Sequence, residues 1–180
     1  MKIQKTISVT LSFLLSGVFF FSCSDDFEEP VKNSVNIDLS GELTMGGPNS
    51  LITDENDPSN KYSRVDSIAQ YGYGAGYTIP DSLKDCDLKL VISGKMRETE
   101  NITGYIAIAL HGKDSIYFWG NVFGYVHVKQ LNTWTNFIDS LIIPKSSNKP
   151  SSQNIKIFPF KQTGKGYYDV DNLLVKITRQ

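Results

Sequence analysis

Residues 87–97 read Asp-Leu-Lys-Leu-Val-Ile-Ser-Gly-Lys-Met-Arg. Apolar and polar side chains alternate in this stretch with the two-residue period of a β-strand. The apolar set is Leu88, Leu90, Ile92 and Met96, and the polar set is Lys89, Ser93, Lys95 and Arg97. The stretch therefore predicts a strand that buries one face in a core and turns the other face to solvent.

Further short β-prone runs, separated by turn residues, lie on both sides of this strand, and no window shows the period of a helix. The runs are Tyr62–Gln70, Gly72–Ile79, Ile102–His111, Ser115–Trp119, Val122–Leu131, Trp134–Ile143, Asn154–Phe160 and Tyr167–Ile177. About nine short strands at this spacing predict an all-β fold, an antiparallel β-sandwich of the jelly-roll kind.

The run Ile102–His111 has an unusual second face. Its core-like face is Ile106, Ile108 and Leu110, and the opposite face is Tyr105, Ala107, Ala109 and His111. Small residues between a tyrosine and a histidine predict a shallow floor with two walls, which suits a ligand better than a plain solvent surface.

The N-terminus has the features of an export signal. Lys2 and Lys5 precede an apolar stretch, residues 7–21, which is followed by Ser22 and Cys23. A cationic start, a short apolar core and a small residue before the cleavage point are typical of a secretory signal peptide, here residues 1–22. The cysteine directly after it resembles the lipidated residue of a lipoprotein signal. The alternative is an ordinary signal peptide with a thiol behind it.

The acidic run that follows Cys23 resembles the export tag of surface lipoproteins in the Bacteroidetes. We therefore expect an outer-membrane protein, held by lipid on Cys23 and facing the cell surface. Residues 23–36 are expected to form a tether and residues 37–180 the sandwich domain. The net charge is −1 and becomes more acidic without the leader, so nucleic acid is not an expected partner. The membrane is expected to be contacted through the lipid anchor only.

The segment Gly166–Val175 resembles the last strand of galactose-binding-like, carbohydrate-binding jelly rolls. Leu88–Gly94, Trp134–Phe137 and Ile155–Phe160 resemble other strands of the same modules. The resemblance implies a β-sandwich that binds a glycan without catalysis.

The same resemblance implies one structural calcium ion, with Asp171 as a ligand. Calcium takes six or more oxygen ligands, and Asn172 with Asp38 or Glu42 could add to them. The alternative is that Asp171 lies at a strand edge and bonds to the backbone.

Sugar recognition needs an aromatic ring that stacks on the apolar side of a pyranose, together with a few polar groups. Tyr105 and Trp119 are the expected platforms, because Tyr105 faces away from the aliphatic stripe and Trp119 adjoins an expected Gly120-Asn121 turn. The expected polar partners on the same sheet are Arg97, His111 and His127. For each residue the alternative is a core or surface role without a ligand.

Four tripeptides have the form Asp-Ser-aliphatic, and their serines are Ser67, Ser82, Ser115 and Ser140. They resemble the O-glycosylation sequon of exported Bacteroidetes proteins, which predicts sugars on at least one of them. The alternative is ordinary turn chemistry, since Asp and Ser both favour turns.

An enzyme is not expected. The sequence has no H-E-x-x-H, C-x-x-C, G-x-S-x-G or phosphate-loop motif, and its best carboxylate pair, Asp169 and Asp171, comes from one strand. Two functions remain. The first is a surface lipoprotein that binds glycan; the second is a structural or protein-interaction subunit of a cell-envelope complex with no sugar site. A contiguous aromatic and polar patch on the strand of Tyr105 would favour the first, and a broad apolar patch or bare strand edge the second.

Overall fold

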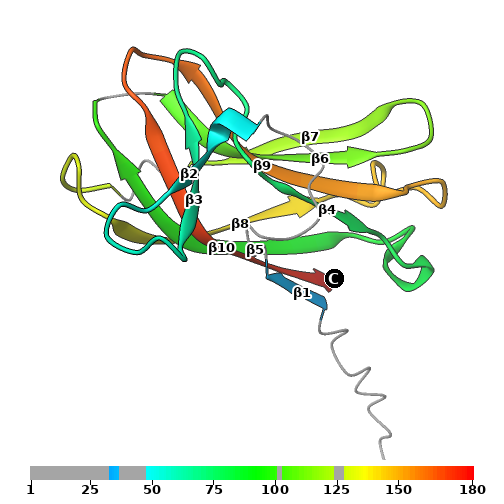
Figure 1. Ribbon diagram of the computed structural model, residues 1–180. Helices are drawn as coiled ribbons and strands as arrows, with labels where there is room; N and C mark the ends of the chain where they lie inside the picture. Colours follow the sequence, from blue (N-terminus) through cyan, green and yellow to red (C-terminus); the bar gives the residue numbers. More distant parts are fainter. Residues whose placement is uncertain (1–32, 37–47, 101–102, 124–127) are drawn as a thin grey trace, which may run out of the picture.

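The computed structural model describes residues 33–36, 48–100, 103–123 and 128–180, which form two antiparallel sheets packed face to face (Figure 1). The six-stranded sheet has the order β2-β3-β10-β5-β8, with β1 also paired to β10. The four-stranded sheet has the order β4-β9-β6-β7. No helix in these ranges is long and apolar enough to cross a membrane.

The strands have the following bounds. The six-stranded sheet contains β1 (Asn33–Asn36), β2 (Leu51–Thr53), β3 (Lys61–Val65), β5 (Leu88–Glu98), β8 (Thr135–Ile143) and β10 (Tyr168–Arg179). The four-stranded sheet contains β4 (Ala75–Thr78), β6 (Thr103–His111), β7 (Ile116–Val122) and β9 (Asn154–Thr163). Two short 3-10 turns, η1 (Pro48–Ser50) and η2 (Asp81–Leu83), lie in the connections.

The strand order is that of a jelly roll. The set β3-β10-β5-β8 faces the set β4-β9-β6-β7, and every pairing is antiparallel. β1 and β2 extend the first set. The predicted antiparallel β-sandwich is therefore confirmed.

The core lies between the sheets and follows the predicted alternation. The inward side chains of β5 are fully buried, and they are Leu88, Leu90, Ile92 and Met96. From the other sheet β6 contributes Ile106, Ile108 and Leu110, also fully buried. Each such side chain stabilises the fold by about 1.5–3 kcal/mol relative to exposure.

Tyr168 joins the two sheets inside this core. Its hydroxyl donates a hydrogen bond to the carbonyl oxygen of Tyr105 at 2.5 Å and accepts one from the N–H of Phe160 at 3.0 Å. The phenol thus fixes β10 against β6 and β9, which holds the two central strands of the four-stranded sheet in place.

Two predicted boundaries were wrong. The Gly120-Asn121 pair is not a turn but lies inside β7, where Gly120 pairs with Ile108 and Asn121 with Ala107. A side chain at Gly120 would meet the ring of Phe118 at 2.7 Å, so the glycine serves close packing there. The predicted strand Val122–Leu131 is consequently absent from its described part, because β7 ends at Val122.

The folded part also begins earlier than residue 37. β1 lies in the predicted tether and pairs with β10, Asn33 opposite Ile177 and Asn36 opposite Leu174. β3 pairs with the first half of β10, and the two halves are separated by an irregularity between Asp171 and Leu174. Asn172 has φ 50° at this point, a conformation that asparagine tolerates better than most residues.

Candidate functional site

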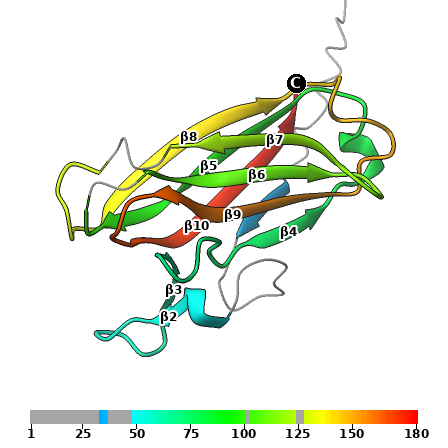
Figure 2. The same ribbon diagram turned by 90° about the horizontal axis from the view of Figure 1, so that it is seen from above.

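The outer face of the four-stranded sheet is a cross-strand grid of aromatic, small and polar side chains. Seen from above, β9, β6 and β7 lie side by side on this face, with β4 beyond β9 (Figure 2). Directly opposed residues of antiparallel strands point to the same side of a sheet. In the order β9, β6, β7, one row is Phe158, Ala107 and Asn121, and the next is Lys156, Ala109 and Trp119.

Six rings form one continuous cluster on this face, which we call the aromatic face: Tyr71, Tyr105, Trp119, Phe123, Phe158 and Phe160. The ring centroid of Tyr71 lies 6.0 Å from that of Phe158 and 5.0 Å from that of Phe160. Tyr105 lies 5.0 Å from Phe160 and 5.9 Å from Phe123, and Trp119 lies 5.8 Å from Phe158. These separations are those of favourable aromatic pairs.

The cluster has a buried base and an exposed top. Phe158 is 1% exposed and Tyr105 is 9% exposed, whereas Tyr71 and Trp119 are each 45% exposed and Phe123 is 39% exposed. The base is a small hydrophobic core separate from the one between the sheets. The exposed rings are therefore held by packing from below and offer their outer surfaces to a ligand.

Trp119 is exposed, as its proposed role as a platform requires, although it lies inside β7 and not beside a turn, whereas Tyr105 is buried. The prediction of Tyr105 as an exposed platform was wrong, because Phe123 and Phe160 pack against its ring. The alternation along β6 correctly shows that Tyr105 faces away from the main core. It cannot show whether side chains from other strands cover the tyrosine ring.

Phe158 and Phe160 belong to this cluster, and the sequence analysis did not predict them as part of the site. They alternate in β9 with Ile155 and Ile157, so this strand is apolar on both faces. Such a run is typical of a strand buried on both sides, so it could have predicted a second apolar layer on the outer face of this sheet.

His111 lies on the same face, opposite Asn154 of β9. It is half-buried, and burial together with the nearby charge of Lys156 lowers its pKa. The imidazole is consequently neutral near pH 7, with one nitrogen that donates and one that accepts a hydrogen bond. His111 thus remains a candidate polar partner, while the predicted partner His127 lies outside the described residues.

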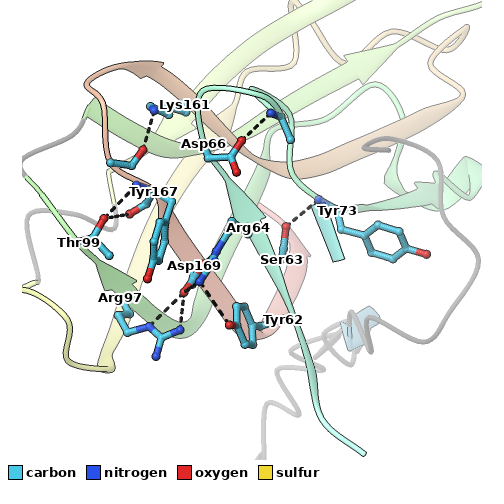
Figure 3. Close-up of polar contacts among 12 residues, drawn as sticks. Tyr62, Ser63, Arg64, Asp66, Tyr73, Arg97, Thr99, Lys161, Tyr167 and Asp169 are labelled. Atoms are coloured by element: carbon cyan, nitrogen blue, oxygen red, sulfur yellow. Dashed lines mark hydrogen bonds and ion pairs between the residues drawn. The ribbon is translucent and has the colours of Figure 1, made fainter. Parts of the chain in front are cut away.

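Arg97 is on the other sheet, so its prediction as a partner of Tyr105 was wrong. It belongs to β5, and its Nη2 lies 2.6 Å from Oδ2 of Asp169 in β10 (Figure 3). Arg64 of β3 approaches the same carboxylate from the opposite side, with Nε 2.7 Å from Oδ1. Periodicity assigns Arg97 to a polar face but does not say which sheet the strand joins.

Aromatic rings flank both guanidinium groups of this ion triad. The guanidinium carbon of Arg64 lies 3.6 Å from the ring centroid of Tyr167, and that of Arg97 lies 4.7 Å from that of Trp134. Asp169 is fully buried, and both of its oxygens accept hydrogen bonds from the arginines. The carboxylate is thus committed to the ion triad, which argues against a catalytic pair with Asp171.

Asp171, the predicted calcium ligand, is buried in β10. Its Oδ1 accepts a hydrogen bond from the N–H of Asn172 at 2.8 Å, and its Oδ2 accepts one from Nδ2 of Asn60 at 3.3 Å. In the described ranges no three His, Cys, Asp or Glu residues gather around one point. The early candidates Asp38 and Glu42 lie outside these ranges, so the calcium site stays a prediction.

The four sequon serines, Ser67, Ser82, Ser115 and Ser140, are all exposed and thus accessible to a modifying enzyme. Asp66 accepts hydrogen bonds from the N–H groups of Ile68 and Ala69, and Asp139 accepts one from that of Ser140. The aspartates therefore shape the local backbone, and glycosylation stays a prediction. Cys23 lies outside the described residues, so its lipidation also stays a prediction.

No protein-family model matches the chain, and no curated protein matches it in sequence. Several solved structures have a similar fold. The VP2 subviral particle of infectious bursal disease virus gives a TM-score of 0.49 at 9% identity, covering 84% of this chain and 33% of that one. The CBM22-1 xylan-binding domain of Paenibacillus barcinonensis Xyn10C gives 0.46 at 10%, covering 82% and 94%. The C-terminal CBM6 of the laminarinase LamC from Zobellia galactanivorans gives 0.42 at 9%, covering 82% and 100%. The chain spans about a third of the viral chain, and likeness at this level concerns the sandwich alone.

Proposed function

We propose that this protein is a non-catalytic surface lipoprotein that binds a glycan on the aromatic face. The observation that carries the proposal is the exposure of Tyr71, Trp119 and Phe123 on one continuous cluster of rings. Contiguous apolar groups on the surface of a soluble domain commonly mark a binding site. Aromatic rings with polar neighbours suit sugars, because a pyranose has an apolar side and a rim of hydroxyl groups.

The polar groups needed for such a site lie around the rings. Asn121, His111 and Lys156 come from three different strands of the sheet and share its outer face. All three lie in strands that are hydrogen-bonded into the sheet, β6 and β9 on both sides and the edge strand β7 on one, so little backbone ordering is needed when a ligand arrives. Preorganisation of this kind favours affinity from a small contact area.

Truncation of Trp119 provides the test. Trp119→Ala is expected to weaken glycan binding by about 1–3 kcal/mol, as the loss of a central aromatic contact does. The melting temperature should change little, because the side chain is half exposed and lies outside the main core. An oligosaccharide array identifies the ligand, and titration calorimetry then compares the variants.

Ile138→Ala is the matched control. Ile138 is 65% exposed but lies on the six-stranded sheet, opposite Ser93, so its truncation should leave glycan binding unchanged. Equal weakening by both variants, or retention of full affinity by Trp119→Ala, would remove the aromatic face from the proposal. An array on which no glycan binds the wild type would contradict glycan binding itself.

Membrane attachment through Cys23 is the second part of the proposal. Cys23→Ser is expected to move the protein from the detergent phase to the aqueous phase in detergent partitioning, since acyl chains supply the attachment. Cys86→Ala is the control, because this other cysteine is buried in the domain and should leave partitioning unchanged. A Cys23→Ser protein that stays in the detergent phase would contradict the lipoprotein assignment.

A protein-interaction subunit is the second candidate function. It is favoured by exposed aliphatic side chains on the outer face of the six-stranded sheet, where Leu174 and Ile138 flank Ser93 in one row and Ile142 lies farther along β8. In that case Ile138→Asp, and not Trp119→Ala, would abolish association with a partner in the cell envelope.

A further inference from the structure

The sheet that carries the aromatic face has a distinctive charge composition. None of its four strands, β4, β6, β7 and β9, contains an aspartate or a glutamate. The chain as a whole has a net charge of −1, and its 19 Asp and Glu residues all lie outside these four strands. The only Lys or Arg residues in these four strands are Lys156 and Lys161, both in β9.

The two lysines point to opposite sides of the sheet. Lys161 is buried, and its Nζ donates a hydrogen bond to the carbonyl oxygen of Gly166 at 2.7 Å. Lys156 is half-buried on the outer face, opposite Ala109 on one side and Gly76 on the other. No hydrogen bond or ion pair joins the Lys156 ammonium to another residue of the described ranges. It is therefore the one outward cation of these strands, and its charge is not neutralised there.

Lys156 and Trp119 lie in one row of the outer face of the sheet. They stand on either side of Ala109, and their strands are therefore about 10 Å apart, twice the spacing of neighbouring strands. Ala109 between them is only 1% exposed, because neighbouring side chains cover it, and the ring of Trp119 meets that of Phe158 at 5.8 Å. A sugar ring stacked on the exposed surface of Trp119 can thus direct its substituents toward the Lys156 ammonium in the same row. Burial and, after it, the charge of Lys156 lower the pKa of His111, so the ammonium also acts on this neighbouring side chain.

We propose that the aromatic face selects anionic glycans, meaning sugars that carry a carboxylate or a sulfate group, and that Lys156 recognises the anion. This inference rests on the proposed glycan binding and names its ligand class. Stacking on Trp119 does not depend on the charge of the sugar. Selectivity comes from the ammonium, which gains a partner of opposite charge only with an anionic ligand, and from the absence in these four strands of carboxylates that would repel one.

The test uses pairs of ligands with the same sugar chain, in which one member carries the anionic group and the other does not. Oligogalacturonate and its methyl ester form the carboxylate pair, and a sulfated oligosaccharide and its desulfated form make the sulfate pair. The purified chain is expected to bind the anionic member of at least one pair about fivefold to tenfold more tightly at low salt. The preference should shrink in 1 M salt, where the screening length falls to about 3 Å. The pair that shows the preference identifies the anion.

Three variants assign the preference to Lys156. Lys156→Gln should bind both members of the pair about equally, Lys156→Arg should keep the preference, and Lys176→Gln should keep it as well. Lys176 is an exposed lysine of β10 in the six-stranded sheet, so this control removes the same charge from the other side of the sandwich. Thermal unfolding verifies that all variants fold like the wild type.

The outcomes separate the two proposals. Equal affinity of the wild type for charged and uncharged members, or an unchanged preference in Lys156→Gln, overturns the anion inference and leaves glycan binding intact. If neither member of either pair binds and the oligosaccharide array is also empty, both proposals fail. The inference is supported if Lys156→Gln loses the preference for the anionic ligand while Lys156→Arg and Lys176→Gln keep it.

Discussion

Asp169→Ala is expected to lower the free energy of unfolding by about 3–5 kcal/mol, the cost of removing one partner from a buried ion pair. Asp169 is fully buried, and its two oxygens hold Arg64 and Arg97 from neighbouring strands at 2.7 and 2.6 Å (Figure 3). Without the carboxylate two guanidinium groups would face each other beneath the rings of Tyr167 and Trp134. The triad joins β3, β10 and β5, so its loss weakens the middle of the six-stranded sheet.

Urea unfolding measures this effect, and Asp81→Ala is the matched control. Asp81 also pairs with a cation, since its Oδ1 lies 2.8 Å from Nζ of Lys84, but its side chain is 96% exposed. Exposed ion pairs contribute little to stability, so the control should remain close to wild type. A loss for Asp169→Ala no larger than that for Asp81→Ala would show that the triad does not stabilise the sheet.

The free energy of unfolding is also expected to fall, by on the order of 3 kcal/mol, as the pH rises from about 5 to 8. The group responsible is Glu98, which is buried at the end of β5 opposite Tyr168. Its Oε1 has no hydrogen-bond partner in the described part of the chain. Burial raises the pKa of this carboxyl from 4.5 to about 7.

The sign follows from proton binding. Between these two pKa values the folded state keeps the proton on Glu98, whereas the unfolded state releases it. Stability is therefore greatest below the unfolded pKa and is lost as the pH rises through the folded one. His111 acts in the opposite direction, because burial lowers its pKa and the folded state then binds fewer protons. Its contribution is common to wild type and Glu98 variants and cancels when they are compared.

Glu98→Gln isolates the effect. The amide is similar in size and does not ionise, so this variant should gain stability over wild type above pH 7 and lose the decline between pH 5 and 8. Glu100→Gln is the control, because Glu100 is exposed two residues along the chain and its replacement should leave the wild-type profile unchanged. Urea unfolding at several pH values tests both. If the stability of the wild type, relative to that of Glu98→Gln, did not fall between pH 5 and 8, Glu98 would not have the raised pKa that its burial implies.

Local patterns predicted the strands whose two faces differ most. The alternation in residues 87–97 predicted β5 and its core face, and the same reasoning predicted β6, because one side chain in two meets the opposing sheet. The same reasoning did not predict β1. Asn-Ser-Val-Asn has no such pattern, and its strand conformation depends on the edge that β10 offers far along the chain.

The candidate site was predictable only in part. The local sequence shows which side of a strand a residue faces, but it does not show which residues of other strands lie next to it. Sequence reasoning placed Trp119 and His111 off the main core, as the structure has them. It could not show that Phe158 and Phe160 would bury Tyr105, nor that Arg97 would meet Asp169, since these contacts join residues far apart in sequence. Strand order decides such contacts, and it depends on packing of the whole sandwich.

The early start of the folded part sets how far the domain can stand from a membrane. If Cys23 carries the proposed anchor, the chain between it and Asn33, where β1 begins, is about ten residues long. A fully extended chain of that length reaches at most about 35 Å, however it is arranged. An anchor on Cys23 would therefore hold the start of β1 within about 35 Å of the membrane surface. With such an anchor, the proposed glycan binding would be limited to the parts of a polymer that come close to the membrane.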